Sequence, residues 1–319
     1  MAVTARTALR REFRVLRREV NPRRPLRNGG LHRRKPSAVL GVPSLALYSV
    51  FVIYPTLATV YYSFTNWQGF GKHSRFVGLA NFRAVLSSSL ERQALTNTVE
   101  ATLGIVVCAN ACGLLVALLL QKNSRLNHVL RLLWFLPAAL PSIVAGYIWT
   151  FIYSPEGPIA SMWHAVDPLA TPPGFIGSPH QALASVAAIA IWQQSGYAMV
   201  VLLAGLKAID PQIQEAATID GVGPLQRLRY VIMPLLRPAF AVSVVLTAVS
   251  GLLLFDAVVA TTDGGPGYAT ETLATQLYKQ AFLFNKFSFG MAMGVLIALL
   301  ILVVSGVLLW SLNRKEATA

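Results

Sequence analysis

The chain has 319 residues, of which 55% are hydrophobic and only 13% are charged, and its 27 Lys and Arg against 13 Asp and Glu leave a formal net charge of +14. Soluble domains carry about 25% charged residues, so this composition excludes an ordinary soluble enzyme. A nucleic-acid-binding protein spreads its basic residues over a folded polar surface, whereas here they gather at one end, so we expect no nucleic-acid partner.

The first 36 residues are strongly basic. A signal peptide would end after about 15–30 residues, but here the apolar run begins only near Ala38 and is too long for a signal-peptide core. We expect residues 1–36 to form a basic cytoplasmic arm, followed by an apolar segment that is kept. An organelle transit peptide is the alternative, because such peptides are also rich in Arg and poor in acidic residues. The arm holds twelve of the basic residues, namely Arg6, Arg10, Arg11, Arg14, Arg17, Arg18, Arg23, Arg24, Arg27, Arg33, Arg34 and Lys35.

Six apolar segments follow along residues 37–319. Each has the roughly 20 residues that a helix needs to cross about 30 Å of hydrocarbon. Hydrocarbon cannot satisfy a free backbone polar group, so each segment is predicted to be helical, with kinks where Pro43, Pro55, Pro137 and Pro141 interrupt it. The sequence therefore predicts an all-α integral membrane protein with six transmembrane helices. The predicted spans are about 38–64, 98–121, 132–153, 183–206, 239–261 and 288–312.

The distribution of Lys and Arg predicts how the chain crosses the membrane. With the N-terminus inside, 21 basic residues fall in the inside segments and 6 in the outside segments. Cytoplasmic loops carry an excess of Lys and Arg. Both termini are therefore expected on the cytoplasmic side of the cell (inner) membrane.

The chain offers no evident chemistry of its own. Cys108 and Cys112 lie four apart in an apolar run, where they stack on one helix face as small hydrophobes, and all five histidines lie outside the predicted spans, so no metal site is expected. No Gly-rich loop closes on Gly-Lys-Ser/Thr, and no catalytic constellation lies at membrane depth. We expect a protein that is not an enzyme and holds no cofactor.

The loop between the fourth and fifth spans predicts a short cytoplasmic helix. Asp210 is a good N-cap with Pro211 in the first helical position, and Gly221 followed by Gly223-Pro224 is a firm stop. On one face, Ile213, Ala216, Ala217 and Asp220 lie three or four apart, and the small alanines let another protein approach closely. Such a helix suits a groove on a partner, although a solvated linker helix is the alternative.

Here the sequence resembles a known family. Glu215-Ala216-Ala217, then Gly221, then Val231-Ile232-Met233-Pro234 resemble the EAA loop of the membrane subunits of ABC importers. Further matches resemble the carbohydrate uptake permeases of the maltose and glycerol-3-phosphate type, although Ser124-Arg125-Leu126 stands where that family often has Arg-Gly-Arg. These matches lie at residues 76–82, 135–137, 141, 192, 196–197, 203–206, 255–256, 262–266 and 269–273.

The resemblance implies a fold, a mechanism and partners. The fold is that of a type I ABC importer permease, a binding-protein-dependent transport system inner membrane component, with a coupling helix between spans four and five. An ATPase dimer binds ATP and Mg, a solute-binding protein delivers the sugar from outside, and a second homologous permease subunit completes the alternating-access path. Within the coupling loop, Glu215 is the expected polar contact to the ATPase, Ala216 and Ala217 the close-packing surface, and Gly221 the turn; Asp220 and Pro234 complete the set.

Five residues are candidates for the substrate path. Trp192, Gln193, Gln194 and Tyr197 could stack on and hydrogen-bond a sugar, or they could serve packing. Asp256 is the ionisable residue well inside a span and is expected to face a cavity or a partner, with an inter-helix hydrogen bond as the alternative. Because the predicted spans contain no Lys, Arg or His, a neutral mono- or oligosaccharide is favoured over a phosphorylated solute.

Three other functions remain open at this point. An ABC permease could carry a non-sugar solute, such as glycerol-3-phosphate, a polyamine or a peptide. An ion-coupled secondary transporter would need intramembrane carboxylates or inverted repeats, and the sequence offers Asp256 alone. A scaffold bound to anionic membrane lipid through the basic arm would leave the capped loop helix without a purpose.

Overall fold

The computed structural model describes residues 38–71, 74–167 and 171–313. The predicted basic arm, residues 1–36, lies outside these residues. The chain divides into two compact units, one ending at Pro55 and the other starting at Thr56, and each is described by itself.

The first unit is helical where it is described. Helix α2 (Ala38–Tyr48) passes into a π-helical turn, η1 (Ser49–Ile53), and α3 (Tyr54–Ser63) begins at the end of this unit. In the π turn the N–H of Tyr54 bonds to the carbonyl of Ser49, five residues back. The wide turn comes directly before Pro55, whose ring would clash with a carbonyl in a regular helix, so the helix continues through the proline.

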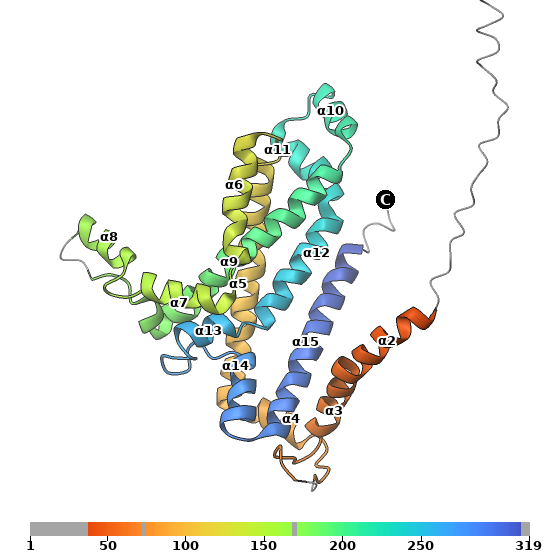
Figure 1. Ribbon diagram of the computed structural model, residues 1–319. Coiled ribbons are helices and arrows are strands. Elements are labelled where there is room, and N and C mark those ends of the chain that lie inside the picture. The colour runs from red at the N-terminus through yellow and green to blue at the C-terminus, as the bar shows by residue number, and fades with distance from the viewer. Residues whose placement is uncertain (1–37, 72–73, 168–170, 314–319) are drawn as a thin grey trace, which may run out of the picture. The chain divides into compact units, whose positions relative to one another are not determined.

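The second unit is built on four long helices. Three of them, α5, α9 and α12, pack against one another, and α15 packs against α12 (Figure 1). Small residues bring the helices close: a Cβ on Gly113 of α5 would lie 2.6 Å from the Cβ of Ala198 on α9. The long helices are α5 (Ser89–Leu119), α9 (Pro179–Ala208), α12 (Met233–Leu252) and α15 (Phe287–Asn313).

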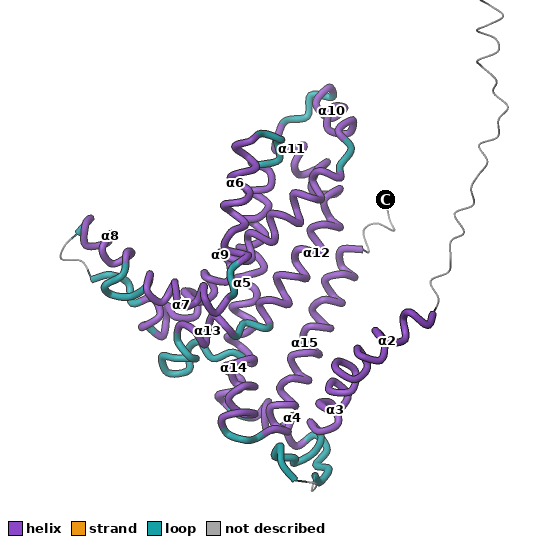
Figure 2. The backbone as a smooth tube through the Cα atoms, viewed as in Figure 1, coloured by secondary structure: helices purple, strands orange, loops and turns teal. Residues whose placement is uncertain are grey.

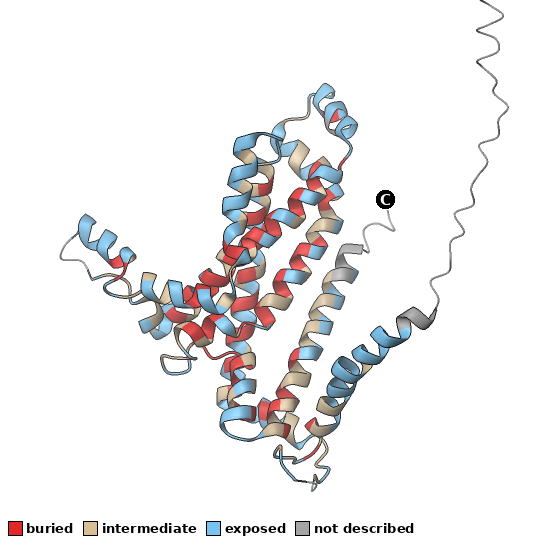
Figure 3. Ribbon diagram, in the orientation of Figure 1, coloured by how far each residue is buried: buried red, intermediate tan, exposed pale blue. Residues whose placement is uncertain are grey.

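Burial follows the helix contacts. The facing sides of α9, α5 and α12 are buried, with Met199, Leu202 and Leu236 at the centre, while the outward faces expose leucines and valines (Figure 3). Exposed apolar faces of this kind suit a hydrocarbon surrounding. Of the helices described, five are long and apolar enough to cross a membrane, or six if a bent pair counts as one span.

A small polar network joins α5 to α12 inside the bundle. The Asn110 amide donates to the Thr247 hydroxyl at 2.9 Å and accepts from the Ser243 hydroxyl at 2.6 Å. All three side chains are buried. Because every member has a partner, the network adds specificity between two apolar helices without leaving a polar group unsatisfied.

Two predicted spans are broken. The third consists of α6 (Arg125–Phe135), the turn η2 (Leu136–Ala139) and α7 (Ser142–Ile152), and its two helices meet at 98°. The segment predicted as one span over 239–261 holds a second break: α12 ends at Leu252, and α13 (Asp256–Thr261) starts after a gap. Hydropathy gives the length of an apolar segment and does not report such bends.

Short elements connect the long helices (Figure 2). In the first connection, the Asn81 amide donates to the carbonyls of Ser63 and Thr65, which accounts for part of the motif at 76–82. Between α9 and α12 the chain forms α10 and α11 and the π turn η4, and between α13 and α15 it forms α14 and the π turn η5. The short elements are α4 (Ala80–Ser87), α8 (Pro158–Val166), η3 (Phe175–Gly177), α10 (Pro211–Ile219), α11 (Pro224–Arg227), η4 (Leu228–Ile232), α14 (Leu273–Tyr278) and η5 (Lys279–Leu283).

Candidate functional site

The predicted loop helix is α10, and its own residues close both of its ends. The Asp210 carboxylate accepts from the N–H of Gln212 at 2.9 Å, and Pro211 occupies the first turn. At the other end, Gly221 N–H bonds to Thr218 O and Val222 N–H to Ala217 O, each at 3.1 Å. These paired bonds form a Schellman motif, in which the residue directly after the C-cap is left-handed, and that residue, Gly221, has φ +72°. The helix is therefore fully capped by this chain.

Most of α10 is exposed (Figure 3). Glu215, Ala216 and Asp220 are exposed, whereas Ala217 is 7% exposed and packs inward. The alanine pair therefore has one member on the free surface and one against this chain. Ile219 stands 86% exposed beside them, so the free face combines a carboxylate, a small residue and a large apolar one. Their role in docking stays a prediction.

The remaining coupling residue, Pro234, belongs to the long helix that follows. Helices α11 and α12 are continuous through the π turn η4, where the N–H of Met233 bonds to the carbonyl of Leu228. As at Pro55, the wide turn directly precedes the proline and lets the helix continue. The Arg227 guanidinium donates to the Thr218 hydroxyl at 3.3 Å, so this long helix is tied to α10 by a side chain as well as by the loop.

Two of the predicted path residues hold the bend in the third span. Pro141 has no N–H to offer, and the Gln193 amide donates to the carbonyls of Pro137 at 3.2 Å and Leu140 at 3.0 Å. The Tyr197 hydroxyl donates to the Ala138 carbonyl at 2.8 Å. Both side chains bond to carbonyls at the bend, where the helix supplies fewer backbone donors; the Pro137 carbonyl also accepts from the Leu140 N–H at 3.2 Å. Gln193 is buried, and Tyr197 remains 43% exposed.

Gln194 and Asp256 line the same pocket at the second break. The Gln194 amide donates to the Ser250 hydroxyl at 2.6 Å, and both residues line a pocket of about 50 Å³ together with Asp256, Gln193 and Ser142. Asp256 is exposed as the first residue of α13. A pocket of this volume holds one or two waters and not a sugar ring, so a sugar would need this region to open or a second chain to widen it.

The fifth predicted path residue, Trp192, lies among other aromatic side chains. Its ring meets that of Trp149 edge to face with centroids 5.5 Å apart, within a cluster that includes Tyr153 and Phe175. It is only partly buried. The structure thus brings Gln193, Gln194 and Asp256 to one pocket and places Trp192 in an aromatic cluster; a path role for each remains a prediction.

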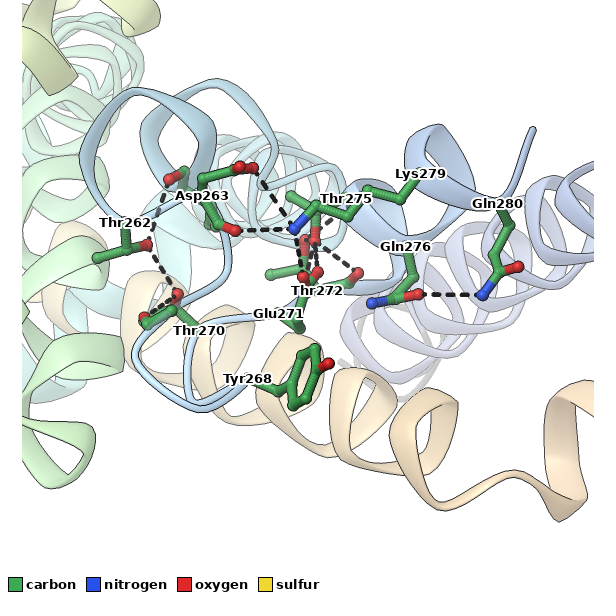
Figure 4. Close-up of polar contacts among 12 residues, drawn as sticks. Thr262, Asp263, Tyr268, Thr270, Glu271, Thr272, Thr275, Gln276, Lys279 and Gln280 are labelled. Carbon is green, nitrogen blue, oxygen red and sulfur yellow. Dashed lines mark hydrogen bonds and ion pairs between the residues drawn. The ribbon is translucent and has the colours of Figure 1, made fainter. Parts of the chain in front are cut away.

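The segment between α13 and α14 lies towards the end of the bundle opposite α10 (Figure 1). It carries a second polar site, which we call the Glu271 cluster (Figure 4). Glu271 has a side chain only 1% exposed, and its carboxylate accepts from the Lys279 ammonium at 2.5 Å and the Thr275 hydroxyl at 2.6 Å. Lys279 also donates to the carbonyl of Asp263 at 2.7 Å. We define the cluster as Glu271, Thr272, Thr275 and Lys279; the exposed carboxylate of Asp263 lies beside it, 3.4 Å from the Lys279 ammonium.

The charges of the cluster are matched. Burial acts to lower the pKa of Lys279, but its hydrogen bond and ion pair with Glu271, together with the nearby Asp263, raise the pKa overall. The lysine therefore stays charged and neutralises the buried carboxylate. From α5, the Asn97 amide nitrogen holds the loop: it lies 3.3, 3.1 and 2.9 Å from the carbonyls of Tyr268, Ala269 and Glu271, which share its two protons.

Sequence reasoning did not assign a role to this cluster. Residues 262–266 and 269–273 were matched to a family pattern, but nothing local shows that Glu271 is buried or that Asn97, far away in the chain, holds its loop. The available signal was the presence of two acidic residues and a lysine, Asp263, Glu271 and Lys279, in a connection between apolar spans. No group of three or more His, Cys, Asp or Glu suited to a metal ion occurs in the part of the chain that is described.

Comparisons with known proteins agree on one family. A family model described as "Binding-protein-dependent transport system inner membrane component" matches residues 109–316. The chain is 32% identical to the sn-glycerol-3-phosphate transport system permease protein of Agrobacterium fabrum, over 83% of this chain and 90% of that protein. It is 29% identical to the trehalose/maltose transport system permease protein of Thermococcus litoralis, over 82% and 88% respectively.

A solved structure shares the fold. One chain of a bacterial ABC transporter involved in the import of the acidic polysaccharide alginate superimposes with a TM-score of 0.75. The match covers 87% of this chain and 94% of that chain at 18% sequence identity. At that identity the likeness shows the fold alone.

Proposed function

Because the chain belongs to the family of binding-protein-dependent transport system inner membrane components, we propose that it is one of two permease subunits of an ATP-driven ABC importer that carries a sugar across the cytoplasmic membrane. Membership accounts for the apolar helices and for a role as a transport subunit. The observation that carries the proposal is α10: a helix capped at both ends by its own chain, exposed over most of its surface and attached to a long helix.

In this proposal α10 docks on the ATPase. Glu215 and Ala216 form the contact surface, while Ala217, Asp220 and Gly221 set its shape and Pro234 lies in the helix that follows. ATP and Mg are bound by a partner ATPase dimer, and closure of that dimer would move α10. The movement would reach the helix 224–252 through the connecting loop and the Arg227–Thr218 hydrogen bond. The chain thus converts ATPase closure into a rocking of helices between two states.

The proposed orientation places α10 and both termini in the cytoplasm. The excess of Lys and Arg in the segments on that side supports it. The Glu271 cluster then lies towards the extracytoplasmic side, where a solute-binding protein would deliver the solute.

A sugar is the proposed solute. The trehalose/maltose relative supports it, and so does the set of amide, hydroxyl and carboxylate groups at the pocket of Gln194, Ser250 and Asp256. Glycerol-3-phosphate is the second candidate, because one relative is a permease for that solute. The lining of the pocket favours the sugar, since it contains no Lys, Arg or His to bind a phosphate.

The first experiment purifies the tagged chain gently from its native membranes and identifies the proteins that accompany it by mass spectrometry. We expect a second permease and an ATPase, both retained in the control Arg92→Ala, which alters an exposed side chain far from α10. The ATPase should be lost when Glu215 and Gly221 are both replaced. Recovery of the chain alone, or as a homo-oligomer insensitive to the double change, would overturn the proposal.

The second experiment identifies the solute. The accompanying binding protein is titrated with maltose, trehalose, sn-glycerol-3-phosphate and spermidine by calorimetry, and the ATPase rate of the reconstituted complex is measured with each. Stimulation by a sugar supports the proposal. Stimulation by glycerol-3-phosphate or spermidine alone would keep the importer and reject the sugar.

A further inference from the structure

The break in span five depends on a side chain from another segment. Leu254 lies in the gap between α12 and α13, and its carbonyl accepts from the Thr272 hydroxyl at 2.8 Å. In a continuous helix that carbonyl would accept from a backbone N–H four residues on. Thr272 is fully buried, so water does not compete for the bond. The threonine therefore takes the place of the missing helix bond.

The orientation of Thr272 depends in turn on Glu271. A hydroxyl has one proton, and the shortest contact of the Thr275 hydroxyl, 2.6 Å, is to the Glu271 carboxylate. Donating there leaves the Thr275 oxygen free to accept from the N–H of Thr272 at 2.9 Å. The Thr275 N–H donates to the side-chain oxygen of Thr272, Oγ1, at 3.3 Å. The two threonines thus hold each other in the arrangement that points the Thr272 hydroxyl at Leu254.

Glu271 itself has little freedom to move. Its carboxylate pairs with Lys279, and a buried carboxylate without a counter-charge would be costly. A Cβ on Gly264 would overlap the same carboxylate, so the turn at 263–265 packs directly against it. Bonds therefore run without interruption from Lys279 through Glu271, Thr275 and Thr272 to the break.

We propose that Glu271 and Lys279 are positioning residues for the translocation path: they fix Leu254, and so hold the break that places Asp256 beside Gln194. That these residues act on a translocation path rests on the proposed function. The series of hydrogen bonds from Lys279 to Leu254 does not. The cluster lies in the connection between spans five and six, and α10 lies in the connection between spans four and five. Successive connections lie on opposite sides of the membrane, so the residues that hold the break lie on the side opposite the proposed ATPase.

The test measures hydrogen exchange of backbone amides by mass spectrometry, on the full chain in its native complex, reconstituted in nanodiscs. In Glu271→Gln we expect peptides covering 251–262 to exchange about tenfold faster, while the middle of α5 and of α9 is unchanged. Lys279→Met should reproduce the effect, and Lys279→Arg should restore protection because it keeps the charge. Asp263→Asn is the matched control: its side chain is 72% exposed, and the carbonyl that binds Lys279 remains, so exchange should stay within about twofold.

A purely structural role would look different. If the cluster only held the fold together, Glu271→Gln would speed exchange throughout the bundle, and Lys279→Arg would not restore the break selectively. That result, or unchanged exchange at 251–262, overturns the proposal. Should Glu271→Gln fail to assemble, Thr275→Val decides the matter, because it removes the relaying hydroxyl and keeps the ion pair.

The same samples separate this proposal from the proposed function. Mass spectrometry of the purified complex reports whether an ATPase is present. If no ATPase is present, the proposed importer function is rejected, while the exchange at 251–262 still tests whether Glu271 holds the break. If an ATPase is present and the exchange at 251–262 is unchanged in Glu271→Gln, only the role of Glu271 is rejected.

Discussion

The α10 loop and the Glu271 cluster lie towards opposite ends of the bundle and differ in what their polar groups bind. On α10, Glu215 and Asp220 point into solvent, and the helix uses its own backbone and Asp210 for its caps. In the cluster, Glu271 and its threonines are buried and bonded to one another, and Thr272 also bonds the Leu254 carbonyl, 18 residues away. Both match family patterns in the sequence. The exposed one is available to a partner, whereas the buried one acts on its own chain.

Two glycines show the contrast most directly. Gly221 has φ +72° and Gly264 has φ +87°, a region that other residues rarely adopt. A Cβ on Gly221 would meet nothing within 4 Å, whereas a Cβ on Gly264 would overlap the Glu271 carboxylate. The backbone requirement is shared, but the surroundings are not, so the same substitution should have different consequences at the two sites.

Gly264→Ala should have the largest effect. Left-handed backbone costs an alanine about 1–2 kcal/mol, and forcing a methyl group against a buried carboxylate adds about 1–3 kcal/mol. We expect a loss of about 2–5 kcal/mol in stability, measured as a large fall in the melting temperature of the purified chain by intrinsic fluorescence. An unchanged melting temperature would show that the cluster is not rigid.

Glu215→Arg should leave the fold intact and remove coupling. The side chain is exposed, so the melting temperature should not change, while ATPase recovery and transport should fall about 10–100-fold if a charged contact is reversed. Leu225→Arg, at a position 78% exposed just outside α10, is the matched control and should retain the ATPase. Equal losses in both variants would mean that α10 is not the specific contact.

Gly221→Ala should have a smaller and local effect. Because a Cβ at this position would contact no neighbour, the alanine should lower the stability only through its left-handed backbone, by about 1–2 kcal/mol. Relaxation of the turn would relieve part of that cost. Gly221→Asn should be milder, since asparagine tolerates the left-handed region better. The measurement is the ratio of solute carried to ATP hydrolysed, expected to fall in the order wild type, Asn, Ala. A wild-type ratio for the alanine variant would remove Gly221 from the coupling machinery.

A change of pH should have the smallest effect over the physiological range. The pKa of Lys279 is raised above its ordinary value of 10.5, so the stability that the lysine contributes is fully present below that value and is lost as pH rises through the raised pKa. Exchange at 251–262, corrected for its intrinsic pH dependence, should be flat from about pH 7 to 10 and should rise only above that. Lys279→Met should lack this alkaline rise. A rise near pH 8 in the wild type would mean that the pair is weaker than its geometry indicates.

The sequence predicted α10 well, and it predicted the kink at Pro137 and Pro141 in its place but not in its size of 98°, whereas the gap at 253–255 was not predicted. Asp210, Pro211 and Gly221 act within a few residues of themselves, so local rules place the helix within one turn. The bend in span three and the gap at 253–255 depend on Gln193 and Thr272, which come from other segments and satisfy the open carbonyls. A hydropathy profile describes one segment at a time and carries no information on hydrogen-bond partners from another segment. Gln193 and Tyr197 were interpreted from their chemistry either as path residues or as packing residues. Their polar groups bind the carbonyls of the bend, a choice of partner that tertiary contacts set, and a path role stays a prediction.

The bend in span three also bears on biosynthesis. Helices α6 and α7 have 11 residues each and are about 17 Å long, which is too short for either to cross the hydrocarbon alone. The carbonyls between them find their donors on α9, which is made later. We therefore expect the insertion machinery to shelter the third segment until the fourth emerges, and the two segments to enter the lipid as a pair. If synthesis stopped after the third segment and before the fourth, the third segment would lack the hydrogen-bond donors it needs to enter the bilayer.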